Sequence, residues 1–125
     1  MTEEAMTDSA DNGAPSPLSV VSTTTDGIRV LTVAGEIDYQ SGVALQRALD
    51  APGDAPARVV LDLHQVTFMD SSGINLFLRA YNALTAAGGW LRLAAPTDSV
   101  RRTLRLVGLD TVIDCHPDLE QALTR

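Results

Sequence analysis

The sequence predicts an α/β fold in which about five strands form a mixed, mainly parallel sheet, in the order ββαβαβαβα. Two β-rich runs flank Asp26-Gly27, a dipeptide typical of a tight hairpin turn. A near-continuous β-branched and aliphatic run at 57–63 is typical of a strand buried on both faces. Segments of helical periodicity then alternate with short strand-like runs, which favours parallel pairing through right-handed crossovers.

The first half of the chain supplies the hairpin and one helix. The hairpin covers residues 18–38, with Gly35 near its end. A helix is expected at 41–51, where Val43, Leu45, Ala48 and Leu49 recur at roughly helical spacing. A loop at 51–56 leads into the buried strand at 57–63. Asp62 within that strand is expected to be a strand-end or edge carboxylate that faces a helix N-terminus.

The second half alternates helices and strands. After a link whose Val66, Phe68 and Met69 should anchor in the core, a helix is expected from about 72 to 87, closed by Gly88-Gly89. A strand at 90–95 precedes a helix at 97–109, with Thr97 or Asp98 as N-cap and Gly108 as the stop. A short strand at 111–115 and a helix at 117–125 complete the chain.

Charge and composition divide the chain into two parts. The first 17 residues contain four acids and no arginine or lysine, and we expect a disordered acidic tail there. Apolar residues make up 45% of the chain, so residues 18–125 should fold as one domain. Removal of the four tail acids takes the net charge from −7 to −3. A mildly acidic domain does not suit binding to nucleic acid, which needs a basic surface.

The residue types that are missing exclude several chemistries. The chain has no lysine, which excludes a Gly-Lys-Ser/Thr phosphate loop, a Schiff-base lysine and a Ser-x-x-Lys pair. The single cysteine, Cys115, excludes an intrachain disulfide and suits a reducing compartment. No apolar run approaches the roughly 20 residues of a membrane span, and the N-terminus lacks a secretory pattern. We therefore expect a cytoplasmic protein that does not bind a membrane.

The tripeptide Asp70-Ser71-Ser72 lies between an apolar run and the start of a helix. One interpretation is that these residues only cap the helix. The other is that Ser71 carries a phosphate, because the free N–H groups and the dipole at a helix N-terminus favour a dianion. Ser72 is the competitor, since spacing alone does not separate adjacent hydroxyls.

The helix that follows has an apolar side and a polar stripe. Ile74, Phe77, Leu78, Tyr81 and Leu84 make the stronger apolar stripe, and Leu76, Ala80 and Ala83 a weaker one. Between them run Ser71, Asn75, Arg79 and Asn82. This polar stripe is either a solvated helix face or a partner-docking face switched at its upper end.

The sequence resembles the anti-sigma factor antagonists, which are single-domain STAS proteins. The resemblance covers residues 18–123, and its most specific element is the apolar-apolar-Asp-Ser-Ser-Gly block at 68–73. The Gly-Glu-x-Asp turn at 35–38 and "LRLVGLD" at 104–110 support it. The resemblance implies a STAS-like fold with helices packed largely on one face of the sheet.

The resemblance also implies a partner switch without catalysis, cofactor or metal in this chain. The unphosphorylated protein would bind an anti-sigma factor that is also a serine kinase, which releases a sigma factor. The kinase would phosphorylate Ser71 and end the binding, and a PP2C-type phosphatase would reset the protein. Asp38 would lie near Ser71. The expected partner-binding residues are Asp38, Asp70, Ser72, Gly73, Ile74, Asn75 and Arg79.

Two other functions are weighed against the switch. A serine hydrolase lacks support because the block is Met-Asp-Ser-Ser-Gly and not Gly-x-Ser-x-Gly, with only His64 and His116 as possible bases. A non-switching STAS scaffold, a subunit of a larger complex, would use the same helix face constitutively. It predicts no phosphorylation and a Ser71→Ala protein that behaves as wild type.

Overall fold

The computed structural model describes residues 18–50 and 57–124, so the tail expected at 1–17 and the loop expected at 51–56 lie outside the described residues. The order of elements confirms the predicted ββαβαβαβα pattern. The elements are β1 (Leu18–Thr25), β2 (Ile28–Ile37), α1 (Gly42–Asp50), β3 (Arg58–Met69), α2 (Ser71–Ala86), β4 (Trp90–Ala94), α3 (Asp98–Leu106), the 3-10 helix η1 (Leu109–Thr111), β5 (Asp114–His116) and α4 (Leu119–Thr124).

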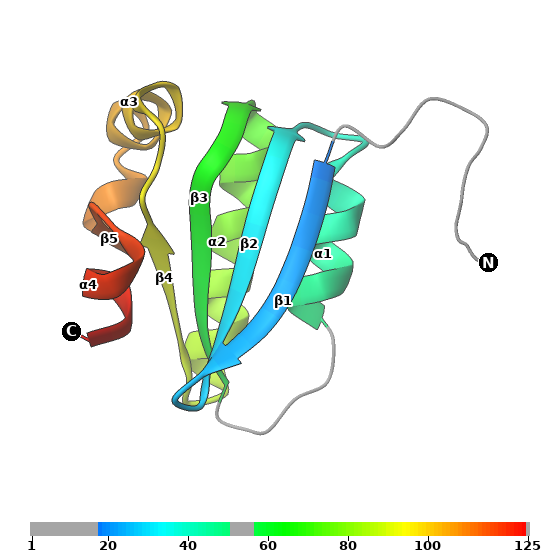
Figure 1. The fold of residues 1–125 in the computed structure, drawn as a ribbon. Coiled ribbons are helices and arrows are strands. Elements are labelled where there is room, and N and C mark those ends of the chain that lie inside the picture. The colour runs from blue at the N-terminus through cyan, green and yellow to red at the C-terminus, as the bar shows by residue number, and fades with distance from the viewer. Residues whose placement is uncertain (1–17, 51–56, 125) are drawn as a thin grey trace.

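The five strands form one sheet in the order β1-β2-β3-β4-β5 (Figure 1). β1 and β2 pair antiparallel, while β2, β3, β4 and β5 pair parallel. The predicted hairpin turn is present, with positive φ at Asp26 (51°) and Gly27 (79°), as a primed two-residue turn requires. Because β2 to β5 are parallel, their carboxyl ends point toward the same side of the molecule.

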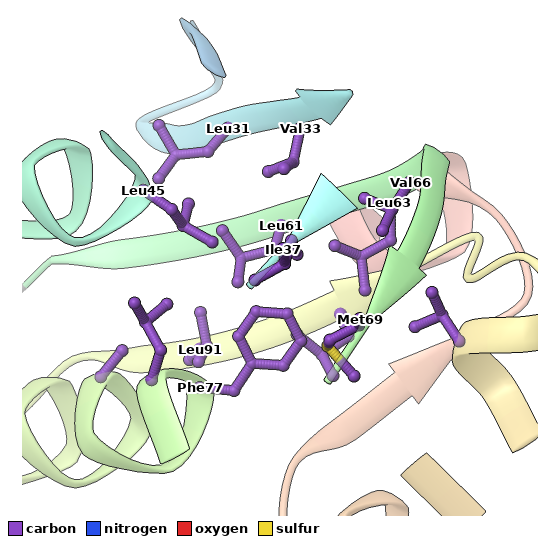
Figure 2. Close-up of a cluster of buried hydrophobic side chains, with 14 of the residues drawn as sticks. Leu31, Val33, Ile37, Leu45, Leu61, Leu63, Val66, Met69, Phe77 and Leu91 are labelled. Carbon is purple, nitrogen blue, oxygen red and sulfur yellow. The ribbon is translucent and has the colours of Figure 1, made fainter. Parts of the chain in front are cut away.

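The main hydrophobic core lies between the sheet and α1, α2 and α3 (Figure 2). Leu31 and Val33 of β2 and Leu61 and Leu63 of β3 are fully buried there, and Phe77 of α2 packs into the same cluster. Helix α4 instead covers a smaller cluster on the opposite face of the sheet, with Ala122 against Ile28, Val60 and Ala94. Three of the four described α-helices thus share one face, as the resemblance to STAS proteins implied.

Strand β3 is longer than predicted because the expected link at 64–69 continues the strand. Its pairing with β2 shifts twice, so that β3 has one extra residue between Asp62 and Gln65 and another between Val66 and Phe68. Each extra residue reverses which side chains face the core. Val66 and Met69 therefore point inward, whereas Phe68 is 47% exposed, and the expectation that Phe68 anchors in the core is wrong.

Two of the helices bury different residues from those that periodicity favoured. In α2 the buried residues are Gly73, Leu76, Phe77 and Ala80, while Leu78 is exposed. Both predicted apolar stripes contribute to the core: Phe77, Ile74, Tyr81 and Leu84 of the stronger stripe pack in or against it together with Leu76 and Ala80 of the weaker one. In α1 Leu45 is buried, but Val43 is 50% exposed. These exposed side chains lie on the surface of the layer that carries the site described next.

Candidate functional site

The candidate site begins where two neighbouring strands, β2 and β3, end side by side. Ile37 and Met69 are the last paired residues of these strands, so Asp38 and Asp70 leave the sheet next to each other. The backbone N–H of Asp70 donates to the carbonyl of Ile37 at 3.1 Å, which ties the two exits together. In a parallel sheet such strand ends are the usual place for ligand and partner sites.

Asp70 is the N-cap of α2 and holds one of the two serines. Its backbone is extended, and its Oδ1 accepts a hydrogen bond from the backbone N–H of Ser72 at 2.9 Å. The same carboxylate oxygen accepts a short hydrogen bond from the Ser72 hydroxyl. The cap interaction anticipated from the sequence is therefore made by Asp70, and Ser72 is its partner.

Ser71 differs from its neighbour in what its hydroxyl contacts. It is the first residue of α2 and is exposed. Within residues 18–50 and 57–124 its hydroxyl makes no hydrogen bond to another side chain or to the backbone. Ser71 thus presents a free hydroxyl at the positive end of a sixteen-residue helix.

Gly73 and Ile74 lie below this surface. Gly73 is buried, and a Cβ added there would lie 2.4 Å from Cγ and 2.8 Å from Sδ of Met69. Ile74 is half-buried and packs against the main core. The absence of a side chain at Gly73 lets the first turn of α2 approach the ends of β2 and β3 closely.

Asp38 organises the turn that leads from β2 into α1. Its Oδ1 accepts from the backbone N–H of Ser41 at 2.8 Å and lies 2.8 Å from the Ser41 hydroxyl. That hydroxyl also lies 2.6 Å from the carbonyl oxygen of Glu36, and it accepts from the Asp38 N–H at 3.0 Å. The hydrogen bonds from the Ser41 backbone and side chain lower the pKa of Asp38, so this carboxylate stays charged near neutral pH.

A hollow of about 230 Å³ lies between α1 and α2, next to the two strand ends. It brings together three predicted site residues, Asp38, Ser72 and Arg79, with residues that the sequence analysis did not select. The lining is completed by Tyr39, Gly42, Val43, Gln46, Arg47 and Leu76. We call this hollow the α1–α2 groove.

Tyr39 and Val43 are the residues that sequence reasoning missed at the groove. Tyr39 is 83% exposed and Val43 is 50% exposed. An aromatic side chain in an otherwise polar strand-to-helix turn is a signal that could have identified Tyr39. Large apolar side chains that stay exposed beside a hollow are typical of interaction surfaces.

The polar stripe predicted along α2 is present. Ser71, Asn75, Arg79 and Asn82 are all exposed, and Arg79 lines the α1–α2 groove. Arg79 also lines a second hollow further along the same two helices, together with Leu49, Asp50 and Ala83. The surface between α1 and α2 therefore extends from the strand ends toward the C-terminal ends of both helices.

Asp62 and His64 of β3 pair with each other and line neither hollow between α1 and α2. Asp62 is buried and accepts from the backbone N–H of His64 at 3.2 Å, with His64 Nδ1 2.7 Å from its Oδ1. The expectation that Asp62 faces a helix N-terminus is therefore wrong, because its partner lies two residues along β3. In the described part of the chain, no group of three His, Cys, Asp or Glu side chains is placed to hold a metal ion.

Comparison with known proteins agrees with this architecture. Residues 19–122 match the STAS domain. The chain belongs to the STAS-domain family. A crystal structure of an anti-sigma factor antagonist from Mycobacterium paratuberculosis superposes with a TM-score of 0.76 at 32% identity, covering 90% of this chain and 97% of that one. The resemblance stated from the Asp-Ser-Ser-Gly block is confirmed.

Two curated STAS relatives carry names of the same kind. The anti-sigma-F factor antagonist RsfB of Mycobacterium tuberculosis is 31% identical over 112 residues, which are 89% of this chain and 91% of RsfB. The anti-sigma-B factor antagonist of Bacillus subtilis is 30% identical over 84 residues, 67% of this chain and 77% of that protein. No helix in the described ranges is long and apolar enough to cross a membrane.

Proposed function

We propose that this STAS protein is an anti-sigma factor antagonist regulated by phosphorylation of Ser71. The unphosphorylated form binds an anti-sigma factor that is also a serine kinase, and so releases a sigma factor. Phosphorylation ends the binding, and a PP2C-type phosphatase restores it. The exchange takes place in the cytoplasm. The names of the STAS relatives support the antagonist role, and the free hydroxyl of Ser71 supports the switch.

The single observation that carries the switch is the different environment of two adjacent serines. The Ser72 hydroxyl is hydrogen-bonded to Asp70, and a phosphate on it would break that bond and bring a second anion to the cap. The Ser71 hydroxyl is exposed at the first position of α2. A phosphate there meets the free N–H groups of the first turn without loss of the cap. This favours Ser71 over its competitor.

Charge explains why the phosphate would end binding. A phosphoserine adds about −1.5 to −2 charges at neutral pH. Asp38 and Asp70 already place two carboxylates at the adjoining strand ends, and the lowered pKa of Asp38 keeps that group ionised. The backbone of Arg79 is eight residues further along α2, about 12 Å from that of Ser71 by helical rise, so Arg79 is not directly adjacent to a phosphate at the helix start. A partner docked there would face a strongly negative rim.

The α1–α2 groove is the surface that the proposal gives to the partner. Tyr39 and Val43 supply exposed apolar area, and Asp38, Arg47 and Arg79 supply charges of both signs. Asn75 extends the polar stripe between Ser71 and Arg79. Gly73 and Ile74, expected as contact residues, support this surface from below through their packing.

The experiment that tests the proposal compares capture and phosphorylation. The full chain is incubated with ATP and an anti-sigma serine kinase from the same organism, and intact mass and peptide mapping locate any added ~80 Da. Ser71→Ala and Ser72→Ala are the matched pair, since each removes one hydroxyl from adjacent positions. We expect Ser71→Ala to bind the kinase and resist modification, while Ser72→Ala is still modified.

The docking surface is tested by measuring how well the Asn75→Ala and Arg79→Ala variants capture the kinase. We expect weaker kinase binding with an unchanged melting temperature, because both side chains are exposed. Modification of Ser72 instead of Ser71 would overturn the assigned phosphoacceptor. Kinase capture by wild type and Ser71→Asp alike, with no phosphate ever found, would leave a non-switching STAS scaffold as the function.

A further inference from the structure

A separate hollow lies away from the α1–α2 groove, where β4 and β5 end. Its volume is about 450 Å³, within the range of small-molecule sites. In Figure 1, α3 lies beyond the ends of β4 and β5, with α4 below it. The hollow shares no residue with the groove, and its lining comprises Pro96, Arg101, Leu104, Arg105, Asp110, Cys115, His116 and Pro117. We call it the α3–β5 pocket.

Positive charge is concentrated at this pocket in a chain whose net charge is −7. Arg101 and Arg105 both line it and are one helical turn apart on α3, so their guanidinium groups can reach the same ligand. Arg101 is oriented by a hydrogen bond to the Pro96 carbonyl at 3.4 Å and lies 3.6 Å from Asp98, a fully exposed carboxylate. Against these two guanidiniums the pocket wall has one carboxylate, Asp110.

An unusual backbone conformation lies next to the lining residue Pro96. Ala95 has a positive φ of 53°, which is uncommon for a residue with a side chain, and its N–H donates to the His116 carbonyl at 2.9 Å. This hydrogen bond joins the end of β4 to the end of β5. Backbone strain of this kind is enriched at binding sites, where the surrounding structure maintains it.

Two further side chains of the wall are polar partners for a ligand. Nε2 of His116 is buried and has no hydrogen-bond partner among the described residues. Burial raises the pKa of the Cys115 thiol despite the nearby Arg101 charge, so the thiol is not an anion that competes for the arginines. The wall therefore combines paired cations, one carboxylate acceptor and a neutral thiol.

We propose that the α3–β5 pocket binds a small phosphomonoester, with Arg101 and Arg105 on the phosphate and Asp110 accepting from a hydroxyl or amine of the same molecule. Two guanidiniums at this spacing match the several acceptor oxygens of a phosphate. The Asp110 carboxylate disfavours an anion that carries only hydrogen-bond acceptors, and it favours an anion that also carries a hydrogen-bond donor. This site is separate from Ser71 and adds a function beyond the proposed partner switch.

The test uses ribose 5-phosphate as the probe, ribose as the uncharged control, and titration calorimetry of the full chain at constant ionic strength. We expect saturable binding of ribose 5-phosphate and none of ribose. Arg101→Gln and Arg105→Gln should each weaken binding about tenfold, the effect of one lost charge-assisted hydrogen bond. Arg102→Gln is the matched control, because Arg102 is on the same helix and does not line the pocket.

Amide chemical shifts provide a second readout that does not depend on the variants. We expect the largest shifts on addition of ribose 5-phosphate at residues 95–97, 101–105, 110 and 115–117. The proposal would be overturned if ribose 5-phosphate showed no saturable binding up to a concentration of about 10 mM. An equal loss in Arg102→Gln would also overturn it, since the arginines would then act only through the general charge of α3.

Discussion

The two edges of the helical layer present opposite chemistry at equivalent places in the fold. Both the α1–α2 groove and the α3–β5 pocket lie where parallel strands end and helices begin. At the first, the strand ends carry Asp38 and Asp70, and Ser71 presents an uncharged free hydroxyl. At the second, Arg101 and Arg105 are permanently charged. In our proposals, a charge added to the first edge ends partner binding, whereas the second edge binds a ligand that is already negatively charged.

The largest expected effect is a loss of kinase binding at one edge that leaves ligand binding at the other edge unchanged. Ser71→Asp should weaken binding of the anti-sigma kinase by about 2 kcal/mol, roughly 30-fold, because it places a charge beside Asp38 and Asp70. The same variant should bind ribose 5-phosphate as wild type does. Binding of both ligands is measured by titration calorimetry. A parallel loss of both affinities would show that the two edges are not independent.

The next effect concerns how closely α2 approaches the strand ends. Gly73→Ala should lower the free energy of unfolding by about 1–3 kcal/mol, since the new Cβ would lie 2.4 Å from Met69 Cγ and 3.0 Å from Ile37 Cγ2. Urea denaturation measures the change. Gly42→Ala is the control, because its added Cβ would meet only Leu76 at 3.7 Å. Equal stability of the two variants would contradict the assigned packing role.

The helix caps at the two edges should contribute similar stability. Asp70→Ala should cost about 1 kcal/mol through loss of the α2 cap. Thr97→Ala should cost about as much, because Thr97 accepts from Val100 N–H and donates to the Val66 carbonyl at 3.0 Å. Thermal unfolding followed by circular dichroism compares them. A large cost at Asp70 with none at Thr97 would mean that only the α2 start depends on its cap.

The smallest effect is a dependence on pH at Asp38. The folded-state pKa of this carboxyl is lowered, so its contribution to stability is present above its ordinary range near 4 and is lost as the pH falls below that range. The difference in the free energy of unfolding between wild type and Asp38→Asn, measured by urea unfolding, should therefore shrink as the pH is lowered from about 5 to about 3. A constant difference across these conditions would contradict the role of the Ser41 hydrogen bonds.

Local sequence signals predicted most of the fold but only part of the surface of the site. The Asp26-Gly27 turn, the start of α2 at Asp70-Ser71 and the end of α2 at Gly88-Gly89 depend on backbone preferences of a few adjacent residues, and all three are present. The exposure of Phe68 depends on the shifted pairing of β3 with β2, which no local pattern encodes. Tyr39 and Val43 belong to the site only because α1 lies beside α2.

The same limit applies to the α3–β5 pocket. The sequence shows three arginines within α3, but which of them share a hollow depends on where β5 and the segment before α4 lie. Arg101 and Arg105 line the pocket while Arg102 does not. Periodicity identifies the side of a helix, and only the packing of neighbouring elements decides whether that side is covered.

The hairpin turn at Asp26-Gly27 has a practical consequence for experiments on this protein. It lies at the amino end of β2, opposite the carboxyl ends where both proposed sites are found (Figure 1). A short exposed turn is a suitable point for insertion of additional residues. A fluorescent reporter attached there would leave Ser71, the groove and the pocket unobstructed, so that partner exchange and ligand binding can be followed in one labelled molecule.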